Sequence, residues 1–123
     1  MIKSTQRLES IPETPCKCFI PPLSYTDFKK AFWGVDKTNG RFAEITVQVC
    51  VHCGTKWLNY LVEFEAFSKS ARWYRGVVSE KELKNLQPEK VVPYIEGLNW
   101  FIFGGSYFSS TGMYGKGEVQ ADL

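Results

Sequence analysis

The sequence predicts an α+β domain that consists mainly of antiparallel sheet with one or two short helices. Apolar and polar residues alternate over residues 42–49 and again over residues 60–67, which is the two-residue period of half-buried strands. Two other segments begin with the capping residues of a short helix. Turn signals separate the expected strands at short intervals, so we expect neighbouring strands to pair antiparallel.

The composition favours a single domain. The chain has 123 residues, of which 44% are hydrophobic, and this is enough for one core. No internal repeat, low-complexity tract or long linker divides it. We therefore expect one domain over residues 1–123, with residues 1–14 as a flexible N-terminal arm and residues 104–123 as a glycine-rich loop, tail or short terminal hairpin.

The first element expected after the arm is a short helix over Tyr25–Phe32. Ser24 followed by Asp27 is a capping pattern, and Gly34 would end the helix. Asn39-Gly40 is a strong turn signal, and the hydrophobic period changes to two after it.

Three strands are expected next, over Phe42–Val49, Tyr60–Phe67 and Arg72–Val78. In the first strand the apolar and polar side chains point to opposite faces: Ile45, Val47 and Val49 against Glu44, Thr46 and Gln48. This pattern places residues 50–54 at the tip of a hairpin.

The remaining elements are a helix and a buried strand. Ser79 and Glu82 form a capping box that begins a short helix. Pro93 argues against a helix over Val91–Glu96, because proline lacks the backbone donor and clashes with the preceding turn. Leu98–Phe103 is expected to be a buried strand.

The first ten residues are polar, and no apolar run approaches the ~20 residues needed to cross a bilayer. We therefore expect a cytoplasmic protein without a membrane partner. In that reducing compartment, four cysteines indicate a metal site or a catalytic pair rather than two disulfides. The net charge of +2 is too small to steer the chain towards nucleic acid by long-range attraction.

The cysteines form two close pairs, Cys16 with Cys18 and Cys50 with Cys53. Zinc prefers four tetrahedral ligands, and two pairs held by separate turns supply them. Gly54 follows the second pair, where the chain must turn sharply and backbone N–H groups can reach the thiolates. The four residues therefore predict one structural Zn²⁺ ion, and a closed site of four thiolates leaves no position for a reactive water.

These residues resemble a zinc-ribbon knuckle over Cys16 to about Trp57. The resemblance rests on the four ligands, Gly54 and the flanking strands. The first pair departs from it, because it is C-x-C rather than C-x-x-C with its own glycine. His52 stands between two ligands of one knuckle, a position from which a side chain usually points away from the metal.

A thiol-disulfide oxidoreductase is the first alternative. Cys50-Val51-His52-Cys53, followed by Val92-Pro93-Tyr94-Ile95 and Gly104-Gly105, loosely resembles the layout of thioredoxins and glutaredoxins. Those folds need the second cysteine inside a helix, whose N-terminus lowers the pKa of the first thiol. The segment from Lys56 onward alternates like a strand instead, and this hypothesis leaves the first cysteine pair unexplained.

Other patterns give weaker signals. Arg72-Trp73-Tyr74-Arg75 interleaves basic and aromatic residues, as single-stranded nucleic-acid platforms do, but on a strand Trp73 and Arg75 share one face and Arg72 and Tyr74 the other. The glycines at 104–105 and 112–117 lack the spacing of a phosphate loop.

Hydrolytic catalysis has little support. His52 is the only histidine and lies between two of the expected ligands, so no nucleophile and base pair can form without dismantling the metal site. Glu63 and Glu65 could share one strand face, where such a pair is usually a solvated surface.

The function that these observations favour is a small zinc-stabilised, non-enzymatic module that binds another protein, with an immunity or inhibitor protein that caps a toxin as a specific form. The four Trp, six Tyr and nine Phe residues would serve both a core and a binding surface. The alternatives are an oxidoreductase that uses Cys50 and Cys53, and a zinc-ribbon nucleic-acid-binding protein.

Overall fold

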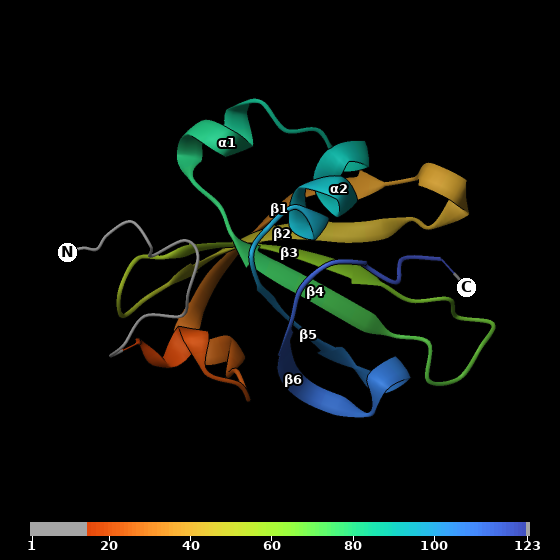
Figure 1. Cartoon of the computed structure of the whole chain (residues 1–123), viewed down its shortest axis with the longest axis horizontal. Helices are drawn as coiled ribbons and strands as arrows, with labels where there is room; N and C mark the ends of the chain where they lie inside the picture. The colour runs from red at the N-terminus through yellow and green to blue at the C-terminus, as the bar shows by residue number, and fades with distance from the viewer. Residues whose placement is uncertain (1–14, 123) are drawn as a thin grey trace.

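The fold is a six-stranded antiparallel sheet in which the strands lie side by side in chain order (Figure 1). The computed structural model describes residues 15–122. The strands are β1 (Phe28–Asp36), β2 (Ala43–Cys50), β3 (Lys56–Val62), β4 (Arg72–Val77), β5 (Phe101–Gly105) and β6 (Ser110–Gly115). Each strand pairs with the next one in the sequence, so β1 and β6 are the two edges.

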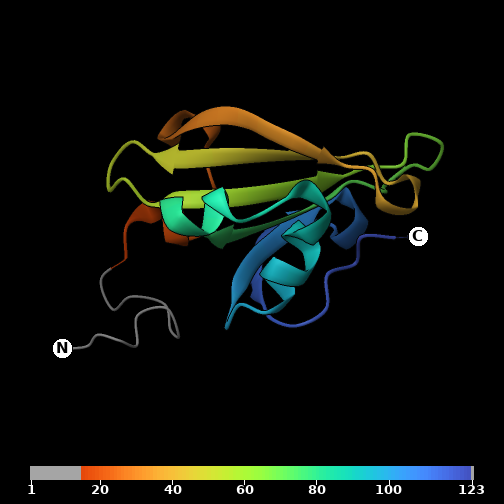
Figure 2. The ribbon, with the colours of Figure 1, turned by 90° about the horizontal axis from the view of Figure 1, so that it is seen from above.

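Helical elements lie on both sides of this sheet (Figures 1 and 2). On one side, which we call the helical face, are α1 (Glu80–Lys84), η5 (Pro88–Lys90) and α2 (Val91–Glu96). On the other side, the open face, are the 3-10 turns η2 (Lys17–Phe19) and η3 (Tyr25–Asp27). Two further 3-10 turns, η4 (Thr38–Gly40) and η6 (Ser106–Phe108), join β1 to β2 and β5 to β6. The predicted α+β class, mostly antiparallel sheet, is confirmed.

None of the helices within residues 15–122 combines the length and the apolar character that crossing a membrane would require.

Strand alternation divides the buried side chains between the two faces. In β3, Leu58, Tyr60 and Val62 are fully buried and pack against the helical elements. Val91, Val92 and Ile95 provide the helical side of this main core. Val119 and Ala121, near the C-terminus, also pack into it. Residues 104–122 hold the end of β5, the strand β6 of the expected terminal hairpin and a segment that closes the core, whereas a loose tail was the other expectation.

The open face carries a second, smaller core at one end. Trp57 of β3 is fully buried there and belongs to a cluster with Phe28, Ile102 and two cysteines, Cys18 and Cys50. The N-terminal segment, residues 15–27, supplies the cover: the Phe19 ring packs edge-on against Trp57 with the centroids 5.1 Å apart. This segment covers only part of the face.

The expected helix over Tyr25–Phe32 is wrong. Ser24 does cap a turn, because its hydroxyl accepts from the Thr26 N–H, but the turn is the single 3-10 turn η3. From Phe28 onward the chain is extended and pairs with β2, with Phe28 opposite Cys50. Pairing along a nine-residue strand outweighs a local capping preference, as tertiary context often does.

The argument from Pro93 against a helix is also wrong, because α2 runs over Val91–Glu96. Pro93 is the third residue of this helix. In the first turn the backbone N–H has no intrahelical acceptor, so the missing donor costs nothing, and the fixed φ of proline suits the helix.

The other local predictions are confirmed, with shifted boundaries. Ser79 and Glu82 form the capping box of α1. Asn39 and Gly40 form the turn between β1 and β2 with positive φ angles of 55° and 73°. β3 begins earlier and ends earlier than expected, and β5 starts at Phe101 rather than Leu98. The predicted flexible arm, residues 1–14, lies outside the described residues.

A buried carboxylate anchors the far end of the sheet. Asp36, at the end of β1, is fully buried. Three donors reach it: the Thr38 N–H at 3.0 Å, the Tyr60 hydroxyl at 2.6 Å and Arg41 Nη1 at 3.0 Å. Burial by itself raises the pKa of Asp36, but these hydrogen bonds outweigh it and hold the pKa below its ordinary value. Arg41 also binds Asp122 at 2.7 Å and so ties the C-terminal segment to the same network.

We expect Asp36→Asn to lower the free energy of unfolding by about 3 kcal/mol, because it removes one partner of a buried ion pair. Asp122→Asn is the matched control: it breaks the other ion pair of Arg41, whose carboxylate side is 48% exposed, and should cost less than about 1 kcal/mol. Urea denaturation of both variants measures the difference.

The pH dependence gives an independent check of the same network. A depressed carboxyl pKa stabilises the fold at pH values above the unfolded pKa of about 3.9, and this contribution is lost as the pH falls through the folded value. The stability difference between wild type and Asp36→Asn should therefore shrink below about pH 4. A difference that stayed constant down to acid unfolding would contradict the assignment.

Candidate metal centre

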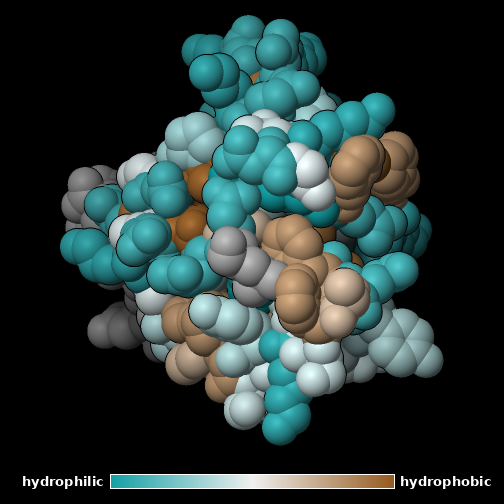
Figure 3. All heavy atoms as spheres, turned by 90° about the vertical axis from the view of Figure 1, so that its right-hand side faces the viewer, coloured by the Kyte–Doolittle hydropathy of each residue, from teal (hydrophilic) through white to brown (hydrophobic). Residues whose placement is uncertain are grey.

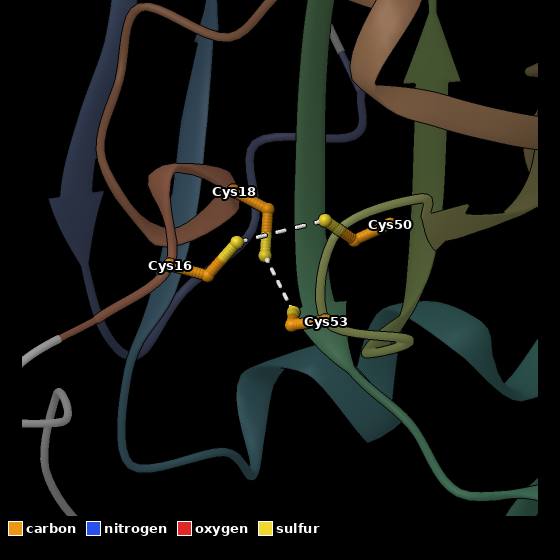
Figure 4. Close-up of side chains that lie close together, drawn as sticks. All are labelled: Cys16, Cys18, Cys50 and Cys53. Carbon is orange, nitrogen blue, oxygen red and sulfur yellow. Dashed lines mark hydrogen bonds between the residues drawn. The ribbon is translucent and has the colours of Figure 1, made fainter.

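The four cysteine thiols converge at one point, where the N-terminal segment meets the turn between β2 and β3 (Figure 4). The Sγ atoms of Cys16 and Cys50 are 3.7 Å apart, and those of Cys18 and Cys53 are 3.6 Å apart. All four sulfur atoms lie within 4.8 Å of one another. A disulfide would need about 2.05 Å, and all four cysteines are free. This cluster could hold a metal ion.

Two separate backbone turns position the ligands. Cys16 and Cys18 flank the first residue of η2, and the Phe19 N–H closes this turn on the Cys16 carbonyl at 2.9 Å. Cys50 ends β2, and Cys53 lies in the turn that follows. The second turn has the features expected of a knuckle: Gly54 has a φ of +80° and its N–H donates to the Cys50 carbonyl.

Backbone N–H groups reach the sulfur atoms, as the sequence predicts for the second pair. The His52 N–H donates to Cys50 Sγ at 3.4 Å. Such N–H to sulfur bonds orient a thiolate ligand and stabilise its charge. The first pair, C-x-C, also places both sulfur atoms in the cluster, so its departure from the usual spacing leaves the ligand set intact.

Burial and hydrogen bonding shift the pKa values of the thiols in different directions. Burial raises the pKa of Cys18 far above its ordinary value, and the nearby Trp57 indole opposes this shift only in part. Trp57 Nε1 is fully buried and has no hydrogen-bond partner. An N–H beside Cys18 that lacks an acceptor suits a thiolate better than a protonated thiol. The donor set therefore fits a metal-bound cluster.

Cys53 is the exposed member of the cluster. Burial raises its pKa, but hydrogen bonds from Thr55 and from the neighbouring thiols outweigh that effect and lower the pKa to about 7. The Cys53 and Thr55 side chains are 3.1 Å apart. Soft thiolates from four cysteines, in this compact arrangement, match the ligands that tetrahedral metal ions take in proteins.

His52 points away from the sulfur atoms, as expected. Its Nε2 lies 2.9 Å from Asp27 Oδ1, and the ring is half-exposed. Lys17 approaches the same carboxylate at 3.5 Å. The His52 hydrogen bond is the largest of the effects that lower the pKa of Asp27. Asp27 also accepts the Val51 N–H at its carbonyl, so it holds the two turns together from outside the cluster.

The turn geometry does not match a thioredoxin-like site. There the cysteine pair lies at the start of a helix, whereas here Lys56–Val62 is strand β3, as the alternation predicts. The sulfur contacts of 3.7 Å and 3.6 Å join Cys50 to Cys16 and Cys53 to Cys18, so they run between the two pairs. Both cysteine pairs belong to one site.

The other candidates from the sequence lie elsewhere. Arg72 and Tyr74 face the main core and Trp73 and Arg75 the open face, as expected, and Arg72 is fully buried and unavailable to a nucleic-acid phosphate. Glu63 and Glu65 are exposed in the loop after β3 rather than on a strand.

Four glycines of residues 104–117 allow close packing, since a Cβ at Gly104, Gly105, Gly112 or Gly115 would meet a neighbour within 2.8 Å. Gly105 has a φ of +119°, and a Cβ there would lie 2.4 Å from the Ala71 carbonyl oxygen. A side chain at this position would therefore separate the β5–β6 hairpin from β4.

Sequence reasoning missed the residues that surround the cluster. Trp57 and Asp27 carry no motif of their own, and only the folded chain brings them to the cysteines. The spacing of Cys53 and Thr55 was the one local signal available, because a hydroxyl two residues after a turn cysteine can reach its sulfur.

Comparisons with protein-family models, with curated proteins and with solved structures find no match to this chain. The four-thiol cluster is consistent with a zinc-knuckle-like site, and the evidence for it is the geometry itself.

His52→Ala should leave the metal content of the purified protein unchanged, because His52 binds Asp27 and no sulfur atom accepts from its ring. Cys53→Ser is the contrasting variant and should reduce metal retention after dialysis, since it removes a ligand from the exposed side. Elemental analysis of both variants measures this. Loss of metal in His52→Ala alone would show that the histidine is a ligand.

Proposed function

We propose that this chain is a zinc-stabilised, non-enzymatic binding protein, in which one Zn²⁺ ion holds the N-terminal segment on the open face of the sheet. The observation that carries the proposal is the spacing of the sulfur atoms. Four sulfur atoms at about 2.3 Å from a tetrahedral zinc ion lie about 3.8 Å from one another. The two closest pairs here are separated by 3.7 Å and 3.6 Å.

The ion would be structural. Four thiolates fill a tetrahedral shell and leave no position for a water molecule or a substrate. One of its consequences is the smaller core: with the segment attached, Phe19 and Leu23 pack over Trp57 and Trp73. Without the ion, four thiols would have to hold this segment through weak S–H contacts.

The proposed partner is another protein, and exposed aromatic side chains support this. Nine large hydrophobic residues of the described part of the chain are exposed, and six of them are Phe or Tyr. Apolar side chains lie among hydrophilic ones at the end of the molecule with the β1–β2 and β3–β4 connections (Figure 3). Phe42 in the first connection is 66% exposed, and Phe67 in the second is 61% exposed. Aromatic residues are enriched in protein interfaces. An immunity or inhibitor protein that caps a toxin is a specific form of this proposal.

The decisive measurement is the metal content of protein purified without chelator, combined with thiol titration before and after denaturation. We expect one zinc ion per chain and four thiols that react only after unfolding, because metal-bound thiolates are masked. Metal-free protein with a reactive thiol at Cys53, the exposed cysteine, would favour thiol chemistry instead.

The double variant Cys16→Ser/Cys18→Ser separates the structural role from an oxidoreductase. We expect it to lose the metal and about 3 kcal/mol or more of unfolding free energy, because metal-binding energy contributes to folding energy. An oxidoreductase that uses Cys50 and Cys53 would keep its fold in this variant and would reduce insulin with dithiothreitol.

The variant pair Phe42→Ser and Phe67→Ser should preserve metal content and stability while weakening any copurifying protein complex.

A further inference from the structure

The open face of the sheet holds a cavity beside the N-terminal segment. Its volume is about 630 Å³, within the range of small-molecule sites, and it is open to solvent on one side. The floor is formed by side chains of β1 to β4, one wall by Leu23, Ser24 and Tyr25 of the N-terminal segment, and the opposite wall by the β5–β6 hairpin. The floor residues are Phe28, Lys30, Gln48, Asn59, Leu61, Trp73 and Arg75.

Arg75 is the unusual residue of this floor. Its side chain is only 5% exposed, and its guanidinium lies 4.5 Å from the centre of the Phe28 ring and 5.2 Å from that of Trp57. Nε and Nη2 are buried, and no group of residues 15–122 forms a hydrogen bond with them. The other buried arginine, Arg72, donates through Nε and Nη1 to the carbonyl groups of Gln120 and Ser70, so only its Nη2 lacks a partner among the described residues.

A buried cation without acceptors is unfavourable. Burial lowers the pKa of Arg75 to about 10, although the proximity of Cys18 opposes this effect, and the group remains charged at neutral pH. The cysteine cluster does not satisfy the two N–H groups, because no sulfur atom is within hydrogen-bonding geometry of them. Aromatic rings stabilise the charge but accept no strong hydrogen bond. Arg75 lines the cavity, so an anionic group bound there can supply an acceptor to the accessible part of the guanidinium.

The charged side chains that line the cavity indicate the sign of the ligand's charge. Lys30 on β1 adds a second cation, and none of the residues between 15 and 122 that line the cavity is an Asp or Glu. Neutral donors come from the amides of Gln48 and Asn59 and from the hydroxyl groups of the hairpin wall, Ser106, Ser109, Ser110 and Thr111. This set suits an anion with several acceptor oxygens.

The apolar side chains of the cavity indicate the chemistry of the uncharged part of the ligand. Trp73 and Leu61 are direct cross-strand neighbours on the floor, and Tyr25 stands on the wall with 77% of its surface exposed. Flat apolar surfaces of this kind stack on a planar ring. A carboxylate attached to such a ring would place its oxygens near Arg75 while the ring contacts Trp73.

We propose that this cavity is a binding site for a small aromatic carboxylate, with Arg75 as the residue that binds the carboxylate group. This goes beyond the proposed role of the metal and of the exposed aromatic residues, and it concerns a different ligand.

The test compares trans-cinnamate with its neutral isostere cinnamamide by isothermal titration calorimetry, on full-length protein whose metal content has been measured. We expect cinnamate to bind about tenfold more tightly than cinnamamide, because only the carboxylate forms charge-assisted hydrogen bonds with Arg75. Arg75→Met should remove about this same factor, since methionine keeps much of the apolar length without the charge. Equal affinities for the two compounds, or no binding of either, would overturn the proposal.

Asn59→Asp is a second test of the proposal, chosen because this variant should preserve the fold. Asn59 lies directly opposite Arg75 in the β3–β4 pair and lines the cavity, so an aspartate there supplies an internal carboxylate to Arg75. The melting temperature should stay the same or rise, while cinnamate affinity falls about tenfold through competition and repulsion. Gln87→Glu makes the same change of charge at an exposed position between α1 and η5 and should leave the affinity unchanged. Unchanged affinity in Asn59→Asp would contradict the role of Arg75, whatever the metal content.

Discussion

The contact of four sulfur atoms between the N-terminal segment and the β2–β3 turn determines which part of the open face is covered and which part forms the cavity. No long strand or helix joins this segment to the sheet. Its other attachments are individual interactions: the Tyr114 hydroxyl donates to the Phe19 carbonyl at 2.6 Å, and the Val51 N–H donates to the Asp27 carbonyl at 2.9 Å. Together with the cysteines they bury Trp57 and form one wall of the cavity. The smaller core and the cavity therefore both depend on this attachment.

A six-stranded sheet has two faces to cover, and this chain covers them differently. The helical elements and the C-terminal segment seal the helical face, where the buried charges are bound by protein groups: Asp36 binds Arg41 and Tyr60, and Arg72 donates to two backbone carbonyls and leaves only Nη2 unpaired among the described residues. Among residues 15–122, the open face has no second layer beyond the segment 15–27 and the 3-10 turns it contains. Its buried charge, Arg75, has rings around it and no acceptor. In a small domain with few buried charges, such an imbalance is more typical of a binding site than of a core.

The chemistry of the two sites is different and complementary. The cysteine cluster is closed, with each sulfur directed at the others, so a bound ion would stabilise structure and take no part in a reaction. The cavity is open, with cations and aromatic rings on its floor and hydroxyl groups on its walls. Under the two proposals, the cavity would bind its ligand by shape and charge, and a metal ion in the cysteine cluster would hold the short N-terminal segment in place.

Local signals in the sequence determined much of this structure. The two-residue alternation of β2, the Ser79–Glu82 capping box and the Asn39-Gly40 turn are interactions between residues close in the chain, so they were visible without the fold. The four cysteines were also predictable as one set, because spacing and soft ligand chemistry together indicate a shared metal. The tertiary structure alone decided the remainder. It made Phe28–Asp36 a strand by pairing it with β2, and it allowed Pro93 in the first turn of α2.

The cavity also belongs to the tertiary structure. Arg75 is one of two arginines in a single short strand, and no pattern in the sequence distinguishes them. The two differ only in the face to which strand alternation assigns them and in what covers that face. Whether a buried charge has a partner depends on residues distant in the chain, and those contacts exist only after folding.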